Sequence, residues 1–195
     1  RPPVAPGLGT GTLMGHRLRA ALSAVLLFAA LLATAGRSAA AAERADANEV
    51  KAAVIYNLLL FVQWPAQPAP GGDLKLCVLE EGALTTALRR HENKTVQGHS
   101  LRILRVGAAP NDLDACAAVM VETGSPELLA RLRLVAHGRA LLILAEGAGA
   151  LDRGAMIGIH GDGGRIGFDI NLRAMKSSGL GASSKLLRLA RSLIE

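Results

Sequence analysis

Two cysteines, Cys77 and Cys116, are the side chains in this sequence with the widest choice of chemistry. A pair of thiols can form a structural disulfide, act as a redox-active dithiol or bind a metal ion. The CxxC spacing of redox-active dithiols is absent. The later histidines lack metal-ligand spacing; they are His91, His99, His137 and His160. Two interpretations remain, a disulfide or two small buried side chains in apolar segments. The redox state of the cellular compartment decides which of them is favoured.

The first 42 residues predict export. Residues 1–13 are rich in Pro and Gly and are read as upstream residues without structure. From Met14 a short basic stretch precedes an apolar run over residues 20–36 and small residues over 38–42, which is the pattern of a secretory signal peptide. We expect cleavage near Ala41 or Ala42, and a retained membrane anchor is the alternative because the run approaches the length that spans a bilayer.

An exported chain enters an oxidising compartment, where an even number of cysteines favours one disulfide. The sequence therefore predicts a Cys77–Cys116 bond in an exported protein, with two unpaired buried cysteines as the alternative. Closing this loop would stabilise the fold by about 4 kcal/mol if loop-closure entropy accounts for the effect.

The net charge of +6 does not indicate nucleic-acid binding. Four of the 22 basic residues precede Glu43, whereas all 16 acidic residues lie at or after it. The predicted mature chain is therefore nearly balanced and offers no electrostatic footprint for a polyanion.

Motifs that carry catalysis or bind cofactors are absent from the sequence. It has neither a GxxxxGK[ST] phosphate loop nor a GxSxG or SxxK nucleophile motif. Glu80 and Glu81 are adjacent on a predicted strand, so they face opposite ways and cannot share acid–base work. Asp162 alone cannot form a calcium loop. We therefore predict no enzyme activity, no cofactor and no metal site.

A few residues resist an explanation by packing alone. Trp64 is the only tryptophan and either completes the core or anchors an interface. In the segment RIGFDI, Asp169 faces away from the apolar side chains and either pairs with Arg165 or contacts a partner. Ile159 and Asp169 look exposed on a turn-bounded ribbon. The predicted partner-binding residues are Trp64, Ile157, Ile159, Arg165 and Asp169.

Hydrophobic spacing and capping residues predict the elements that position these side chains. Helices are expected over residues 48–61, 83–91, 126–135 and 171–178, and from Ser183 or Ser184 onward, with Leu186, Leu189 and Leu193 facing inward. Strands are expected over 74–79, 101–106, 117–122 and 140–144. The segments MIGIH and RIGFDI flank the loop 161–164 and predict a β-hairpin.

Alternating strands and helices predict an α/β fold in which helices pack on a single sheet. The C-terminal hairpin, followed by two helices, makes this sheet mixed rather than fully parallel. The domain plan is upstream residues 1–13, a signal peptide over 14–42 and one layered domain over 43–195.

Four segments together resemble the YfiR-like family of bacterial periplasmic proteins. They are VKAAVIYNLLLFVQWP (50–65), LCVLE (76–80), GAMIGIHGDGGRIGFDINLRAMKSSGL (154–180) and SSKLLRLA (183–190). The resemblance implies that Cys77 and Cys116 match a disulfide-bonded pair and that Trp64 belongs to the family's WP. Asp169 stands where the family commonly has Glu in FEIN. Some members have a second cysteine pair that this chain lacks, so a switch that exchanges two disulfides is not expected.

The resemblance implies regulation by binding. Family members resemble soluble repressors that hold the periplasmic part of the inner-membrane diguanylate cyclase YfiN and lower cyclic di-GMP synthesis and biofilm formation. The expected partner is such a cyclase or another membrane signalling protein, and a homodimer is left open. The alternatives are a periplasmic small-molecule binding or sensor protein and an exported enzyme of unknown type.

Overall fold

The computed structural model describes residues 44–65, 72–162 and 165–195, except the side chain of Asp162. The predicted signal peptide, its cleavage site and the loop glycines Gly163 and Gly164 lie outside the described residues. Residues 45–195 form one compact unit. None of the helices in the described ranges combines the length and apolar character needed to cross a bilayer.

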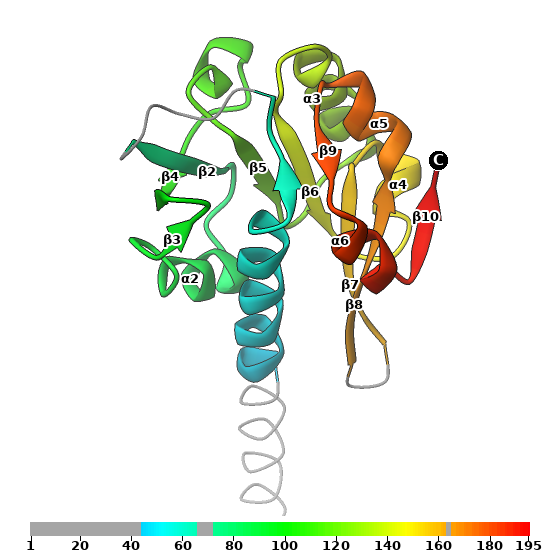
Figure 1. The fold of residues 1–195 in the computed structure, drawn as a ribbon. Helices are drawn as coiled ribbons and strands as arrows, with labels where there is room; N and C mark the ends of the chain where they lie inside the picture. The colour runs from blue at the N-terminus through cyan, green and yellow to red at the C-terminus, as the bar shows by residue number, and fades with distance from the viewer. Residues whose placement is uncertain (1–43, 66–71, 163–164) are drawn as a thin grey trace, which may run out of the picture. The chain divides into compact units, whose positions relative to one another are not determined.

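An eight-stranded mixed sheet forms the centre of the fold (Figure 1), with the order β10-β8-β7-β6-β5-β2-β4-β3. The five central strands β4, β2, β5, β6 and β7 are parallel, whereas β3 and β8 are antiparallel to their neighbours β4 and β7. The strands are β2 (Asp73–Val78), β3 (Thr95–Val96), β4 (His99–Arg105), β5 (Ala118–Val121), β6 (Leu142–Glu146), β7 (Ile157–Asp162), β8 (Arg165–Asn171) and β10 (Ser192–Ile194). This mixed sheet with its C-terminal hairpin confirms the predicted fold class.

Three helices begin at the capping residues that the sequence indicates, whereas the first helix begins before residue 48, where its start is predicted, and ends at residue 59. Ser125 Oγ accepts a hydrogen bond from Leu128 N at the start of α3, and Asn171 and Ser183 cap α5 and α6 in the same way. A helix occupies residues 44–59. The others are α2 (Ala83–Arg89), η1 (Pro110–Leu113), α3 (Pro126–Ala136), α4 (Ala150–Arg153), α5 (Leu172–Ser177) and α6 (Ser184–Leu189).

The helix over residues 44–59 lies beside α2. Glu49 forms an ion pair with Arg90, and the ring of Tyr56 lies 5.2 Å from that of His91. Ile55 and Leu59 are fully buried. The central strands β2, β5 and β6 are almost wholly buried as well, which is the mark of a parallel sheet covered on both faces.

The end of the chain differs from the prediction. Leu186 is buried as expected, but α6 ends at Leu189, and residues 192–194 form β10 beside β8. Leu189 is 62% exposed and Leu193 36% exposed, so the inward orientation predicted for both is wrong. The apolar spacing does match a helix, but pairing with the edge of β8 draws the chain into an extended conformation instead.

Two further short strands extend the fold beyond the prediction. β1 (Val62–Gln63) pairs antiparallel with β9 (Gly181–Ala182) and forms a separate two-stranded sheet. This ladder ties the exit of the first helix to the segment between α5 and α6. It also fixes the position of Trp64, which directly follows β1.

Candidate functional site

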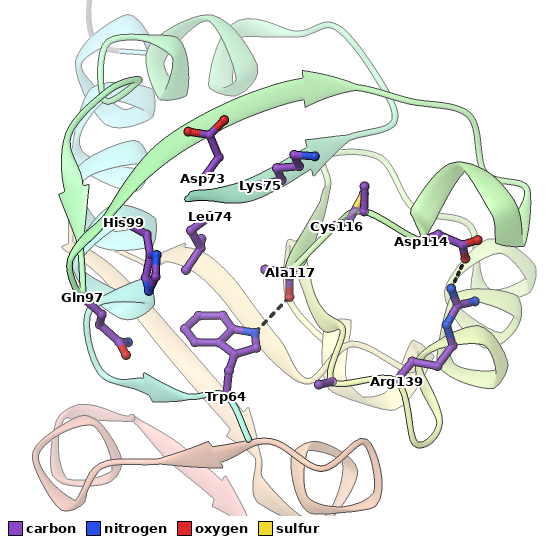
Figure 2. Close-up of a pocket in the computed structure, with 12 residues that line it drawn as sticks. Trp64, Asp73, Leu74, Lys75, Gln97, His99, Asp114, Cys116, Ala117 and Arg139 are labelled. Carbon is purple, nitrogen blue, oxygen red and sulfur yellow. Dashed lines mark hydrogen bonds and ion pairs between the residues drawn. The ribbon is translucent and has the colours of Figure 1, made fainter. Parts of the chain in front are cut away.

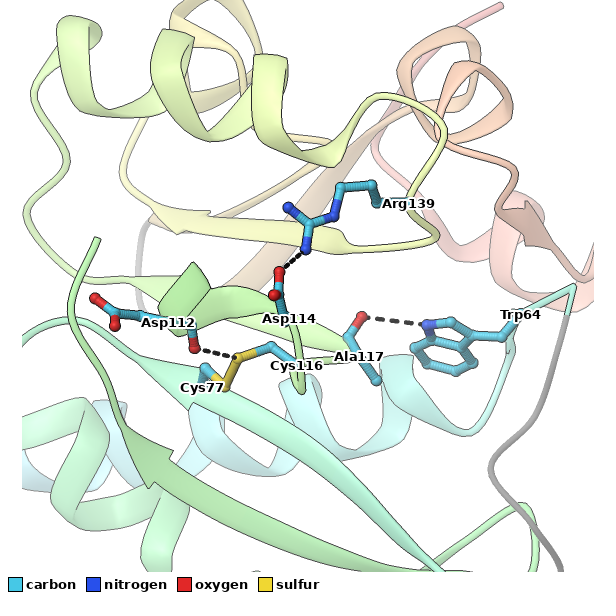
Figure 3. The surroundings of a disulfide bond; sticks show 7 residues. All are labelled: Trp64, Cys77, Asp112, Asp114, Cys116, Ala117 and Arg139. Carbon is cyan, nitrogen blue, oxygen red and sulfur yellow. Dashed lines mark hydrogen bonds and ion pairs between the residues drawn. A yellow bond between two sulfur atoms is a disulfide. The ribbon is translucent and has the colours of Figure 1, made fainter. Parts of the chain in front are cut away.

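The disulfide joins neighbouring strands of the sheet. Cys77 lies in β2, and Cys116 lies two residues before β5, which pairs with β2. The bond is formed, with the two Cα atoms 5.8 Å apart, and it confirms the predicted pairing (Figure 3). Cys116 Sγ also lies 3.8 Å from the carbonyl oxygen of Asp112. The bond thus closes a loop that includes α2, β4 and η1.

A pocket of about 270 Å³ opens beside the disulfide. Figure 2 shows its lining, which comes from the amino ends of β2, β4, β5 and β6. Asp73 and Lys75 come from β2, His99 from β4, and Cys116 itself forms part of the wall. In open parallel sheets ligands generally bind at the opposite, carboxyl edge, so this pocket has an unusual place.

Trp64 forms one side of this pocket. Its indole Nε1 donates a hydrogen bond to the carbonyl oxygen of Ala117 at 3.2 Å, and its ring packs against the core. Across the pocket Asp114 and Arg139 form an ion pair. An aromatic face, a paired guanidinium and the nearby Lys75 together suit a small polar or zwitterionic molecule.

At the carboxyl edge of the sheet, where ligands usually bind, the loops after β2 and β5 are hydrogen-bonded to each other. Glu122 Oε1 accepts hydrogen bonds from the backbone N and the Oγ1 of Thr85, both at 2.6 Å, at the first turn of α2. Glu80 Oε2 accepts in turn from Thr123 N at 3.0 Å. A Cβ at Gly82 would lie 2.1 Å from the Glu122 carboxylate, so a larger residue there would displace this side chain from its hydrogen bonds. The carboxylates of Glu80 and Glu122 therefore join the loops that follow β2 and β5, an arrangement that we call the carboxylate clasp.

The β7–β8 hairpin extends beyond the sheet that carries it (Figure 1). The ladder between β6 and β7 ends at Glu146 and Ile159, whereas β7 and β8 stay paired as far as Asp162 and Arg165. The outer pairs of the hairpin therefore have strand partners only in each other. A two-stranded ribbon of this kind presents both faces and is a natural docking element.

Asp169 lies beside His160 on one face of this ribbon. His160 Nε2 is 3.1 Å from Asp169 Oδ2, and the imidazole lies over Gly167, where a Cβ would be only 3.1 Å from His160 Cε1. Asp169 Oδ1 is buried with no hydrogen-bond partner among the described residues. The predicted pair between Asp169 and Arg165 is not formed, because Arg165 sits four residues away at the exposed end of β8.

The other face of the ribbon corrects a prediction. Ile157 and Ile159 are fully buried, because β7 lies between β6 and β8 and its apolar face points into the core. The prediction that Ile159 is exposed is therefore wrong, and the burial of both side chains argues against their predicted role in partner binding. Ile166 and Phe168, on the same face of β8, are half-buried, and Ile166 lies opposite Gly161, which has no side chain to cover it.

The structure separates the predicted partner-binding residues. Trp64 lies in the pocket next to β5, whereas Arg165 and Asp169 belong to β8, on the far side of β6 and β7. Sequence reasoning missed His160, Glu122 and Arg139. His160 could have been found from strand register, since it stands opposite Gly167. Within the described residues no group of His, Cys, Asp and Glu side chains could hold a metal ion.

Comparison with known proteins identifies a family. Residues 48–191 match the YfiR/HmsC-like family, and this range covers most of the chain. No curated protein sequence matches the chain.

The chain is weakly similar to several solved structures. The chain is similar to a conserved domain protein from Vibrio cholerae, with 12% identity, a TM-score of 0.45, and coverage of 75% of this chain and 60% of that one. It is similar to an ABC domain from Streptococcus pneumonia in complex with L-Trp, with 9% identity, a TM-score of 0.41 and coverage of 62% and 55%. It is also similar to YbdL from Escherichia coli, described as a methionine aminotransferase, with 10% identity, a TM-score of 0.37 and coverage of 69% and 40%. The chain thus spans less than two thirds of each of these structures.

Proposed function

Because this chain belongs to the YfiR/HmsC-like family, we propose that it is a periplasmic repressor of an inner-membrane diguanylate cyclase and lowers cyclic di-GMP synthesis. The match over residues 48–191 carries the proposal. Family membership supports a role in periplasmic regulation in general. The specific partner is the step that we add, and another membrane signalling protein is the alternative.

We place the contact surface on the overhanging part of the β7–β8 ribbon. Ile166 provides half-buried apolar area on one face of the overhanging part, and Phe168 adjoins it where β7 still pairs with β6. Arg165 is an exposed residue at the same end of β8, and because side chains alternate along a strand it lies on the opposite face. A partner that encloses the end of the ribbon would contact both faces, and arginine and large apolar side chains are enriched in specific interfaces.

Repression then needs no chemistry. A protein that binds the inactive conformation of the cyclase better than the active one shifts the population by its difference in affinity. A preference of about 10⁴-fold moves such an equilibrium from almost fully active to almost fully inactive.

A binding experiment on the ribbon tests this proposal. The mature protein and the periplasmic region of a cyclase from the same cell are mixed and titrated by calorimetry. We expect Arg165→Glu to weaken binding at least about tenfold, since an interface charge is reversed, and to raise cyclic di-GMP in cells. Arg105→Glu makes the same charge change at the exposed end of β4 and should leave both readouts unchanged. Failure of the unchanged protein to bind any such region would refute the proposal.

A second candidate function is the recognition of a small molecule in the pocket of Trp64 and Arg139. Its volume of about 270 Å³ suits a ligand of amino-acid size. A ligand that binds only the native protein must raise its melting temperature, so a thermal-shift screen of polar metabolites tests it. Any hit should be lost in Arg139→Met, and a screen without hits would rule this function out.

A further inference from the structure

The C-terminal part of the chain differs in charge from the rest of the sheet. Residues 165–195 contain six Lys and Arg against two Asp and Glu, whereas residues 72–124 contain six against seven. One of the two C-terminal carboxylates, Asp169, already lies beside His160. The cationic side chains of α5 and α6 are exposed; they are Arg173, Lys176, Lys185 and Arg188.

These cations surround exposed apolar side chains. Leu189 is 62% exposed at the end of α6, and Leu193 and Ile194 are 36% and 37% exposed in β10. Lys185, Arg188 and Leu189 are spaced i, i+3 and i+4, so they share one face of α6. Leu186 faces the core instead. Leu189 therefore leaves its apolar surface in water, which is unfavourable unless another apolar layer covers it.

Contacts bring α5 and β10 together. Arg173 Nε donates a hydrogen bond to the carbonyl oxygen of Glu195 at 3.0 Å, which places the guanidinium beside the exposed strand. Figure 1 shows α5, α6 and the edge strand β10 in the right-hand part of the molecule. Lys185 Nζ lies 4.7 Å from the centre of the Phe61 ring. No ion pair among the described residues includes Lys176, Lys185 or Arg188, so no described carboxylate neutralises their charges.

We propose that this C-terminal basic surface, formed by Arg173, Lys176, Lys185, Arg188, Leu189 and Leu193, binds the surface of an anionic phospholipid bilayer. A bilayer interface offers anionic headgroups to the cations and an apolar layer below them to the leucines. The cations spread over two short helices and line neither of the two pockets described for this chain. A broad anionic plane matches that spread better than a single acidic peptide does.

This inference goes beyond repression of a cyclase. Peripheral binding would hold an exported regulator near membrane-embedded partners and reduce its search for them to two dimensions. It also stands independently, because lipid vesicles contain no cyclase, and failure of either experiment leaves the other one intact.

Vesicle co-sedimentation tests the surface. Protein purified from the periplasm is mixed with vesicles of phosphatidylglycerol and phosphatidylcholine or with phosphatidylcholine alone. We expect binding only to the anionic vesicles, and a large loss of binding between about 0.1 M and about 1 M salt, where the Debye length falls from about 10 Å to about 3 Å. Equal binding to neutral vesicles would overturn the proposal.

Matched variants locate the surface. Each cation contributes about fivefold to affinity, so Lys185→Glu with Arg188→Glu should weaken binding by more than about 25-fold. Lys94→Glu with Arg105→Glu makes the same charge change within residues 72–124, where basic and acidic residues are nearly balanced, and this variant should bind vesicles as before. Leu189→Ser should weaken binding by about fivefold, whereas Leu134→Ser, at an even more exposed leucine of α3, should not. Circular dichroism melting confirms that each variant is folded.

An acidic protein is the competing occupant. If the surface binds an acidic protein instead, poly-glutamate should capture this chain while anionic vesicles do not. Replacement of Arg188 should then weaken the capture, and replacement of Leu189 should not. That result, or an equal loss in the Lys94 and Arg105 control, would overturn the lipid assignment.

Discussion

The strands around the disulfide and the β7–β8 ribbon use hydrogen bonds and burial in opposite ways. Around the disulfide, strands β2 and β5 are paired on both sides, and Glu80 and Glu122 satisfy the loops that follow them. In the ribbon, the outer strand pairs have no other neighbours among the described strands, and Asp169 keeps a buried oxygen with no hydrogen-bond partner in the described part of the chain. We infer that the region around the disulfide stabilises the fold, whereas the ribbon is the part available for binding a partner.

Removal of the disulfide should have the largest effect on stability. The variant Cys77→Ala with Cys116→Ala frees a loop of sequence separation 39 in the unfolded chain. We expect the free energy of unfolding to fall by about 4 kcal/mol, measured by urea denaturation. Partner affinity without denaturant should change less than twofold, because the ribbon lies outside the closed loop.

Reduction of the unchanged protein provides the control for this experiment. It should reproduce the loss of stability without any change in sequence. The contrast between the two regions breaks down if the reduced protein keeps its stability but loses its partner, since the disulfide would then act on recognition.

Loss of the hydrogen bonds that Glu80 and Glu122 accept, the carboxylate clasp, should have the second-largest effect on stability. Glu122→Ala leaves the backbone N of Thr85 without its partner at the first turn of α2. A lost hydrogen bond to a charged group costs about 2 kcal/mol, which urea denaturation can resolve. Glu81→Ala is the matched control, because its ion pair with Arg89 is exposed and contributes less than about 1 kcal/mol. Equal losses in the two variants would show that the clasp adds nothing to the scaffold.

Two glycines of the ribbon give a third, smaller test. A Cβ at Gly167 would lie 3.1 Å from His160 Cε1, so Gly167→Ala pushes the imidazole away from Asp169. We expect a loss of about 1 kcal/mol and weaker partner binding. At Gly161 a Cβ meets only Ile166 Cδ1 at an ordinary 3.5 Å, so Gly161→Ala should retain full stability. If Gly167→Ala is as stable as Gly161→Ala, the His160 contact does not hold the ribbon in shape.

Local signals were enough to predict the scaffold. Apolar runs predicted the central strands, and Ser125, Asn171 and Ser183 predicted the starts of three helices because a cap acts within one turn. The disulfide followed from cysteine count and compartment. Each of these inferences depends on residues that are close in sequence or on composition.

Features that depend on tertiary neighbours could not be predicted. Glu122 reaches α2 across 37 residues, and no local pattern marks that contact. Ile159 looked exposed because one ribbon considered alone has two open faces, and only the position of β6 shows that it is buried. Leu193 followed a helical spacing, yet pairing with β8 decided its conformation.

The dependence of the unfolding free energy on pH should be the smallest effect. It arises at His91, inside the loop that the disulfide closes. Burial first, and then the nearby Lys94 ammonium, lower the pKa of His91 below its usual value, while Glu49 opposes the shift. Lys94 Nζ lies 3.2 Å from His91 Nδ1, a contact that requires an unprotonated nitrogen. The unfolded chain therefore takes up a proton before the folded one does, so stability is full above about pH 6.5 and decreases as the pH falls below it. Urea midpoints between about pH 5 and pH 8 should show this slope, and His91→Gln should reduce it. If the slope is unchanged in His91→Gln, the acid-sensitive group is not His91. The pH dependence would then not distinguish the region around the disulfide from the ribbon.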